Sequence, residues 1–162
     1  MSASTLTGKI RQKLANRKVA IIFGILYVLS QLTIYLIIRD ISGEKMLAFQ
    51  TNFSKAVFLE TIGAWKLAGI LDAFKLHFIP DYFHPIWYSI FLASLMALAF
   101  NAAKVSERLN FLLLMPFVAG FLDLVENTMQ LIIISDIGGI TDAKVFVAAL
   151  AASTKWVLVS IT

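Results

Sequence analysis

The sequence contains no cysteine. This absence excludes disulfide bonds, thiolate-bound zinc, iron–sulfur clusters and thiol catalysis in any compartment. Charge is also scarce, since 15% of the 162 residues are charged and 59% are hydrophobic, against about 25% and about 45–50% in soluble domains. The mean hydropathy of +0.83 agrees with this bias. The composition therefore indicates a polytopic membrane protein.

Several catalytic and cofactor motifs are missing as well. The chain has no nucleophile elbow, no phosphate-binding glycine loop and no dinucleotide fingerprint. His77 and His84 lie near Asp72 and Asp81, but their spacing does not match a helical ligand pair such as H-x-x-x-H. We therefore expect neither a metal site nor a cofactor.

Four hydrophobic segments are long enough to cross a bilayer as helices, because about 20 helical residues measure about 30 Å, the thickness of the hydrocarbon core. They cover about residues 19–38, 85–103, 110–134 and 143–161. The sequence thus predicts an all-α membrane protein, a four-helix transmembrane bundle with residues 1–162 forming a single membrane domain. Pro116 is expected to kink the third span, because its missing N–H frees a carbonyl one turn back.

The distribution of basic residues predicts the orientation in the membrane. The arm at 1–18 carries five bases and no acid, and the turn at 104–109 adds two bases. Because bases favour the cytoplasmic side, we expect a bacterial inner-membrane protein with both termini cytoplasmic and residues 39–83 extracytoplasmic. The bases are not interleaved with aromatic residues, so nucleic acid is not an expected partner. Membrane lipids are expected partners, and homo-oligomerisation stays open.

The extracytoplasmic segment is expected to hold short amphipathic elements between the first and second spans. The apolar run at 45–53 is too short for its periodicity to separate strand from helix. Ser54 has the place of a helix N-cap, and Phe53 and Phe58 flank it at the spacing of a hydrophobic staple. Gly63 and Gly69 are expected to divide the stretch after Ser54 into two short helices, whose apolar faces need the bilayer surface or the mouth of the bundle as a partner.

The third span carries a polar stripe formed by Asp123, Glu126, Asn127 and Gln130. On a helix these four residues share one face, because steps of three, four and seven residues return to nearly the same angle. A charged side chain at the centre of a membrane helix costs about 2.5 to 3.5 kcal/mol on insertion scales. The two acids therefore need partners or a polar cavity.

The depth of each residue along its helix suggests the identity of those partners. At about 1.5 Å per residue, Asp123 lies about 16 Å and Lys155 about 18 Å from the outer ends of their spans, so the two are expected to form a structural pair. Glu126 and Asn127 have no such evident partner in the spans. Tyr88 and Tyr35 lie at their depth, with Asp81, His84 and Arg39 at the outer rim. We therefore expect a polar pocket in the outer half of the bundle, roofed by residues 43–79. The expected ligand-binding residues are Glu126, Asn127, Asp123, Tyr88, Gln130 and Asp81.

Three functions remain open for such a pocket. The first is binding of a lipid or small amphiphilic ligand. The second is a structural or partner-binding role in which the buried acids only hold the bundle together. The third is a lipid-modifying enzyme in which Glu126 is the candidate catalytic acid or base.

Three short patterns together resemble a family of uncharacterised four-span bacterial membrane proteins. They are the Gln50…Ser54…Trp65 run, Asp81-x-x-x-Pro85-x-x-Tyr88 and Asp123-x-x-Glu126-Asn127. The resemblance covers most of the chain beyond the first span, and it implies an architecture and a site but no activity. His84 and the Asp123–Lys155 pair are not part of the pattern.

Overall fold

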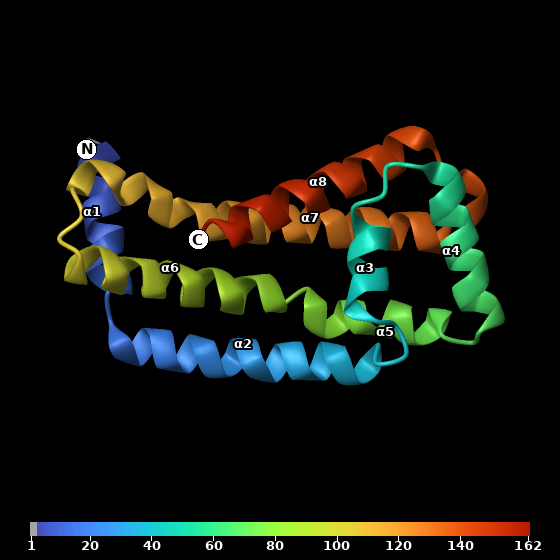
Figure 1. Cartoon of the computed structure of the whole chain (residues 1–162), viewed down its shortest axis with the longest axis horizontal. Helices are drawn as coiled ribbons and strands as arrows, with labels where there is room; N and C mark the ends of the chain where they lie inside the picture. The colour runs from blue at the N-terminus through green and yellow to red at the C-terminus, as the bar shows by residue number, and fades with distance from the viewer. Residues whose placement is uncertain (1–2) are drawn as a thin grey trace.

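The computed structural model describes residues 3–162, and every regular element in that range is helical (Figure 1). The elements are α1 (Ala3–Leu14), α2 (Arg17–Ile37), α3 (Gly43–Gln50), α4 (Lys55–Leu67), α5 (Leu71–Asp81), α6 (His84–Ala102), the 3-10 helix η1 (Glu107–Leu114), α7 (Met115–Ser135), the 3-10 helix η2 (Ile137–Gly139) and α8 (Asp142–Ser160). The all-α prediction is confirmed, and the ambiguous run at 45–53 is mostly helical.

Four helical segments are long and apolar enough to span a membrane. They are Arg17–Ile37, His84–Ala102, Glu107–Ser135 and Asp142–Ser160. The chain is therefore a multi-pass, all-helical membrane protein, as predicted. Pro116 does not kink a continuous helix; it lies in the first turn of α7, directly after η1. A proline is tolerated there because the first-turn N–H groups have no partner within the helix.

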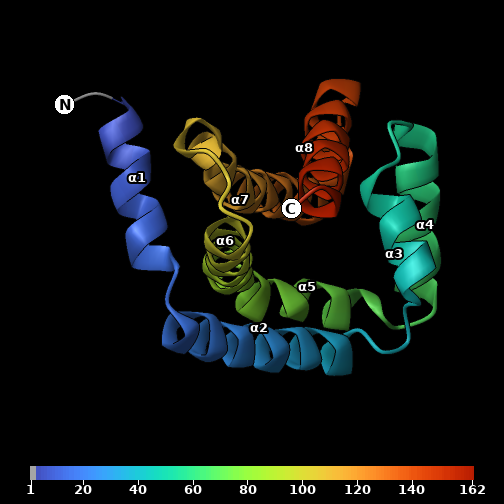
Figure 2. The same cartoon turned by 60° about the vertical axis from the view of Figure 1, so that its left-hand side comes forward.

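The four spans form an arc in the order α2, α6, α7, α8 (Figures 1 and 2). Each of these helices packs against the next in that order, and α2 also packs against α5. In the described part of the chain, the two edge helices α2 and α8 do not pack against each other. The bundle is therefore open along one side.

Small residues allow the inner helices of the arc to approach closely. Ala148, Ala149, Ala151 and Ala152 of α8 are buried at the interface side of that helix. On α7, a Cβ at Gly120 would collide with Ser89 of α6. Close helix contact of this kind is typical of membrane bundles, where packing rather than the hydrophobic effect drives association.

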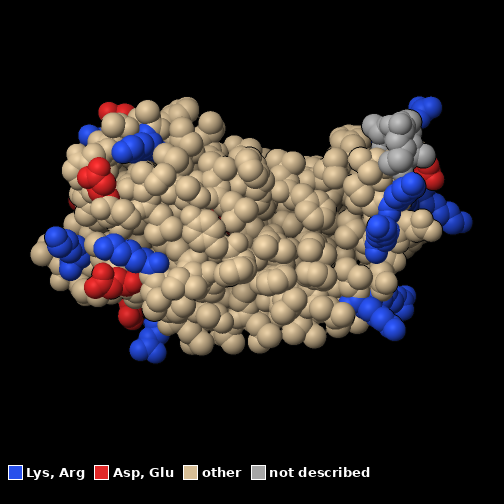
Figure 3. Space-filling view, turned by 180° about the vertical axis from the view of Figure 1, so that it is seen from behind, with Lys and Arg blue, Asp and Glu red and all other residues tan. Residues whose placement is uncertain are grey.

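On the face shown in Figure 3, the charged side chains at the surface lie at the two ends of the molecule, and a broad uncharged belt separates them. One end carries seven bases and one acid, namely Lys9, Arg11, Lys13, Arg17, Lys18, Lys104, Arg108 and Glu107. At this end α1 lies across the bundle, and the Arg11 guanidinium donates to the Asn101 and Asn110 side chains at 2.8 and 2.9 Å. The opposite end carries both signs of charge.

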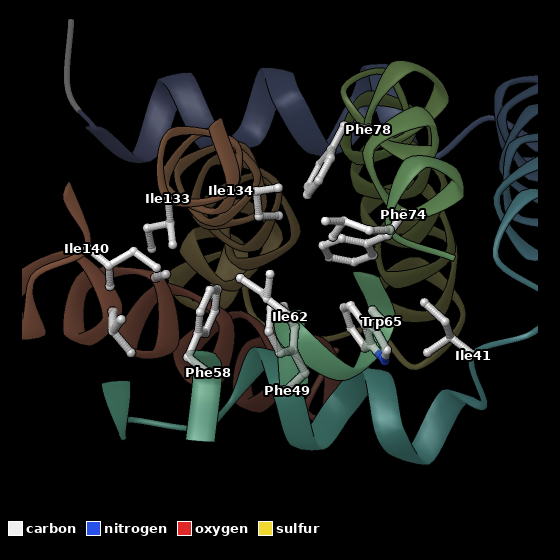
Figure 4. Packing of buried hydrophobic residues seen from close by; sticks show 13 residues of the cluster. Ile41, Phe49, Phe58, Ile62, Trp65, Phe74, Phe78, Ile133, Ile134 and Ile140 are labelled. Atoms are coloured by element: carbon white, nitrogen blue, oxygen red, sulfur yellow. The ribbon is translucent and has the colours of Figure 1, made fainter. Parts of the chain in front are cut away.

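The opposite end is built on a cluster of aromatic residues from α3, α4 and α5 (Figure 4). Phe49 lies at its centre, with ring centroids 4.3 Å from Phe58, 4.7 Å from Trp65 and 5.6 Å from Phe74. The cluster also includes Ile133 of α7. The apolar faces of α4 and α5 are therefore covered by the mouth of the bundle, one of the two partners expected for them.

Local signals in this segment were correct in part. Ser54 caps α4 by accepting a hydrogen bond from the Val57 N–H at 3.5 Å, as expected. Gly63 does not interrupt α4, whereas Gly69, with φ of 73°, lies between α4 and α5 in a conformation that favours glycine. Phe53 packs its ring against Phe146, at 5.5 Å, while Phe58 packs against Phe49.

Candidate functional site

Lys155 and two acids form an ion triad inside the bundle. Lys155 Nζ of α8 lies 2.8 Å from Asp123 Oδ1 and 2.5 Å from Glu126 Oε2, both on α7. All three residues are at most 5% exposed. The structure thus brings Asp123 and Lys155 together, but the expectation that Glu126 lacks a partner in the spans is wrong. Residues 123 and 126 are one helical turn apart on the same face, so one long lysine side chain reaches both carboxylates.

The rest of the polar stripe is also paired. Gln130 Nε2 donates to Glu126 Oε1 at 2.9 Å, and Asn127 Nδ2 donates to the Asp81 carbonyl oxygen at 3.3 Å. These bonds connect α7 to itself and to the end of α5. Buried polar groups in a bilayer need such partners, because no water is available to replace them.

A cavity of about 720 Å³ lies beside the triad. Helix α2 and residues 38–42 form one wall, α3 crosses one end, and α5, α6, α7 and α8 supply the remaining walls. Its polar lining residues are Gln31, Arg39, Ser42, Gln50, His77, Asp81, His84, Tyr88, Asp123 and Lys155. The cavity therefore occupies the open side of the arc, between the edge helices α2 and α8.

Only half of the predicted site residues line this cavity. Asp81, Tyr88 and Asp123 do so, together with Lys155. The other three, Glu126, Asn127 and Gln130, do not line it and are at most 1% exposed. Within the described chain, the stripe is thus divided between the cavity wall and the packed interior of α5, α7 and α8.

His77 presents an uncharged ring to the cavity. Its Nδ1–H donates to the Phe74 carbonyl oxygen, and its Nε2 lies 3.8 Å from Asp81 Oδ2. Burial lowers the pKa of His77 to about 4, although the Phe74 bond and the Asp123 charge oppose the shift. With Nδ1 protonated in a neutral ring, Nε2 is a hydrogen-bond acceptor.

Asp81 is held in an environment that disfavours its charge. Burial raises the pKa of the Asp81 carboxyl to about 7, and the nearby Asp123 charge adds to the rise while Lys155 opposes it. Asp81 closes α5, outside the four spans, and its side chain is 13% exposed. A carboxyl titrating near neutral pH therefore borders the cavity.

His84 and Tyr88 place a polar surface on α6. His84 Nδ1 lies 2.7 Å from Ser30 Oγ of α2, which connects the edge helix to the bundle. Tyr88 is 6% exposed, and its hydroxyl has no hydrogen-bond partner among the described residues; it lies near the Asp123 carboxylate, but outside hydrogen-bond geometry. Such an unpartnered buried hydroxyl is a site where a ligand atom can bind favourably.

The sequence assigned two parts of the site incompletely. Tyr35 was expected at the depth of Glu126, and Gln31 four residues before it, but neither was included among the ligand-binding residues; both line the cavity from α2. His77 was considered only as a metal ligand, although His77 and Asp81 have the (i, i+4) spacing of neighbours on a helix. No group of three acid or histidine side chains suited to a metal ion occurs in the described residues.

Fold and site together define a multi-pass helical membrane protein with a partly charged internal cavity. Comparisons with protein-family models, with curated proteins and with solved structures find no match for this chain. The resemblance to four-span bacterial membrane proteins therefore rests on the three short patterns alone.

Proposed function

We propose that this protein binds a lipid or small amphiphile in the cavity between α2 and α8. The polar head lies among Asp81, Tyr88 and Asp123, and the apolar chain leaves the cavity between the two edge helices. The observation that carries the proposal is a cavity, containing an unpartnered buried hydroxyl, on the open side of the arc. A bilayer surrounds that side, so the ligand would come from the membrane.

The size and lining of the cavity support an amphiphilic ligand. Its volume of about 720 Å³ falls within the range of about 300–1,000 Å³ found for small-molecule sites. Apolar side chains such as Ile34, Met46 and Val159 share the lining with the polar groups. A ligand with one polar end and one apolar end matches both kinds of surface.

The proposed orientation follows from the charged ends. The base-rich end, which carries α1, is placed in the cytoplasm of a bacterial cell by the positive-inside tendency. Ile161 and Thr162 border the same pocket as Phe100 and Leu112, which supports the proposal that both termini are cytoplasmic. Helix α3 and its side of the cavity then belong to the extracytoplasmic half.

A bulky side chain at Gly43 tests the proposal. Gly43 lines the cavity, and a Cβ there meets nothing within 4 Å, so Gly43→Trp adds an indole at the cavity wall without an evident clash. Gly63→Trp is the matched control, because Gly63 is equally unobstructed but lies on α4, away from the cavity. Native mass spectrometry from lipid nanodiscs measures retained amphiphile.

We expect an amphiphile to stay bound to wild type and to Gly63→Trp, and to be lost from Gly43→Trp. Absence of any retained amphiphile in wild type, or equal retention by Gly43→Trp, overturns the proposal.

A structural role is the alternative for the other half of the stripe. Glu126, Asn127 and Gln130 are fully paired or packed away from the cavity, which favours their holding α5, α7 and α8 together. The same burial weighs against Glu126 as a catalytic acid or base, because a substrate in the cavity has no direct access to it. Asp81 and Tyr88 are the groups that a bound amphiphile would touch.

A further inference from the structure

We infer that the cavity selects amphiphiles with a protonated amine head, such as long-chain primary amines. The inference rests on the proposed function and names its ligand class. The inference is based on the polar groups around the Tyr88 hydroxyl. Together these groups offer a ligand more hydrogen-bond acceptors than donors.

The acceptors come from two helices, α5 and α7. His77 Nε2 is an acceptor because Nδ1 already donates to Phe74. The Asp81 side chain faces His77 across 3.8 Å. Asp123 accepts a hydrogen bond from Lys155 at Oδ1, and its carboxylate also lies close to the Tyr88 hydroxyl. An ammonium head supplies three N–H donors and no acceptor, which matches this arrangement.

The one buried cation in this part of the cavity wall is already engaged. Lys155 Nζ contacts both Asp123 and Glu126, and it lies 5.1 Å from the centre of the Trp156 ring. Lys155 therefore brings no unpaired positive charge to the cavity. A carboxylate or phosphate head would lie against the acids of the wall without a free cation to bind it, whereas an ammonium head would find acceptors there.

Lys155 also shows that this part of the bundle accommodates an ammonium group. Its ammonium is held inside the bundle by acid side chains and one aromatic face. The cavity has further aromatic faces next to its acids, since Tyr88 and Tyr27 both lie against His84, at 5.4 and 5.3 Å between ring centroids. Acids combined with aromatic faces are a recurrent setting for ligand cations.

Among the described residues, Arg39 is the other cation that lines the cavity. It attracts an anionic head less than the buried acids attract an ammonium head. It follows α2 and its residue is exposed, so water and salt screen its charge. The buried acids act at shorter range and with less screening.

Three probes of equal chain length test the inference: dodecylamine, dodecanol and dodecanoate. Each is titrated into nanodiscs of zwitterionic lipid that contain the protein, and bound probe is counted by native mass spectrometry. Occupancy lost in Gly43→Trp defines the cavity-bound fraction and removes the contribution of the bilayer. We expect dodecylamine to bind at least about tenfold more tightly than the other two, the worth of one charge-assisted hydrogen bond.

Two variants test which side chains bind the amine head, and a third variant is the control. Asp81→Asn should weaken dodecylamine binding by about tenfold and leave dodecanol binding nearly unchanged. Asp72→Asn should change neither, because Asp72 lies on the same helix with its side chain 97% exposed. Tyr88→Phe, which keeps the ring, should weaken binding through the lost hydroxyl and provides an independent result if Asp81→Asn folds poorly.

The outcomes separate the inference from the proposed function. If dodecanol or dodecanoate occupies the cavity as well as dodecylamine, the amine inference is overturned and amphiphile binding stands. If Asp81→Asn and Tyr88→Phe both bind dodecylamine like wild type, the assigned groups are wrong. If no probe shows occupancy sensitive to Gly43→Trp, the proposed function itself fails.

Discussion

The two edge helices that flank the cavity are held in different ways. On α8, six residues are buried, and the set combines alanines with the lysine of the ion triad. On the longer α2, only Ala20 and Ile34 are buried. Its attachments to α6 include the approach of Gly24 to the Phe91 ring and the bond between Ser30 and His84. One wall of the cavity is therefore fixed by buried charge, and the other by packing against α6 and α5 that buries few of its side chains.

Because of this difference, the α8 wall and the α2 wall should differ in how easily they move. Separating α8 from α7 exposes three charged groups to hydrocarbon, which makes that wall costly to move. Moving α2 mainly exchanges contacts with α6 for contacts with lipid, which costs less. We expect the ligand to pass on the α2 side, while α7 and α8 keep the head groups in place.

Removing the lysine should produce the largest change on the α8 side. Lys155→Met leaves Asp123 and Glu126 without their cation, and loss of one partner from a buried pair costs about 3–5 kcal/mol. The free energy of unfolding, measured by denaturant titration in lipid, should fall by this amount. Lys75→Met, at a side chain that is 45% exposed, should change it little.

Stability lost in Lys155→Met can be restored by also removing the acids that the lysine pairs with. A double change of Lys155 and Asp123 still leaves Glu126 unpaired, so we expect only partial recovery of stability. The triple variant Lys155→Met, Asp123→Asn, Glu126→Gln removes all three charges and should recover most of it. A triple variant less stable than Lys155→Met would contradict the triad as the source of the loss.

Overpacking should produce a smaller change on the α2 side. A Cβ at Gly24 lies 2.9 Å from Phe91 Cε2, a ring that also lines the cavity. Gly24→Leu should therefore push α2 from α6 at a cost of about 1–3 kcal/mol, seen as a lower thermal midpoint. Gly63→Leu, where the space is open, is the control. Equal loss in both variants would contradict a specific α2–α6 contact.

The loss of a hydrogen bond between helices gives the next smaller effect. Ser30→Ala removes the 2.7 Å bond to His84 Nδ1 and also the bond within α2 from Ser30 Oγ to the Tyr27 carbonyl oxygen. The loss of the bond to His84 should cost about 0.5–1.5 kcal/mol. Faster hydrogen exchange of α2 amides would show that the loss loosens this wall. Thr33→Val tests the specificity of the effect, because the Thr33 hydroxyl bonds only within α2, to the Leu29 carbonyl.

The last prediction concerns the pH dependence of stability at Asp81, not a loss of stability at one pH. Because burial raises its pKa to about 7, the folded chain holds the Asp81 proton that the unfolded chain has released, and stability falls as pH rises from about 4 to about 7. His77, with its pKa lowered to about 4, has the opposite sign and adds stability as pH rises towards about 6.5. The charged groups that act on Asp81 are Asp123, Glu126 and Lys155, and Asp123 also acts on His77.

Asp81→Asn should therefore be more stable than wild type at pH 8, and the difference should vanish near pH 4. Thermal midpoints measured across this range in lipid give the comparison, with Asp72→Asn as the control. A constant offset at every pH would show that the effect comes from packing and not from the carboxyl proton.

Much of this architecture could be predicted from the positions of residues along the chain. Hydrophobic length located the four spans, charge located the two ends, and the capping residue Ser54 located the start of α4. Depth along the helices also placed Lys155 level with Asp123, because a helix rises by a constant amount per residue. These properties depend on distance along an element, and each can be counted in the sequence.

Tertiary structure decided how the helices are rotated and which ones are neighbours. Those choices brought Lys155 to Glu126 as well as Asp123, left Asn127 and Gln130 off the cavity, and added His77 and α2 to its walls. Spacing along one helix shows that residues share a face, but it does not show what that face meets. The packing of side chains from separate helices decides which surface that face contacts. In this protein the packing leaves α2 and α8 apart, with a cavity between them.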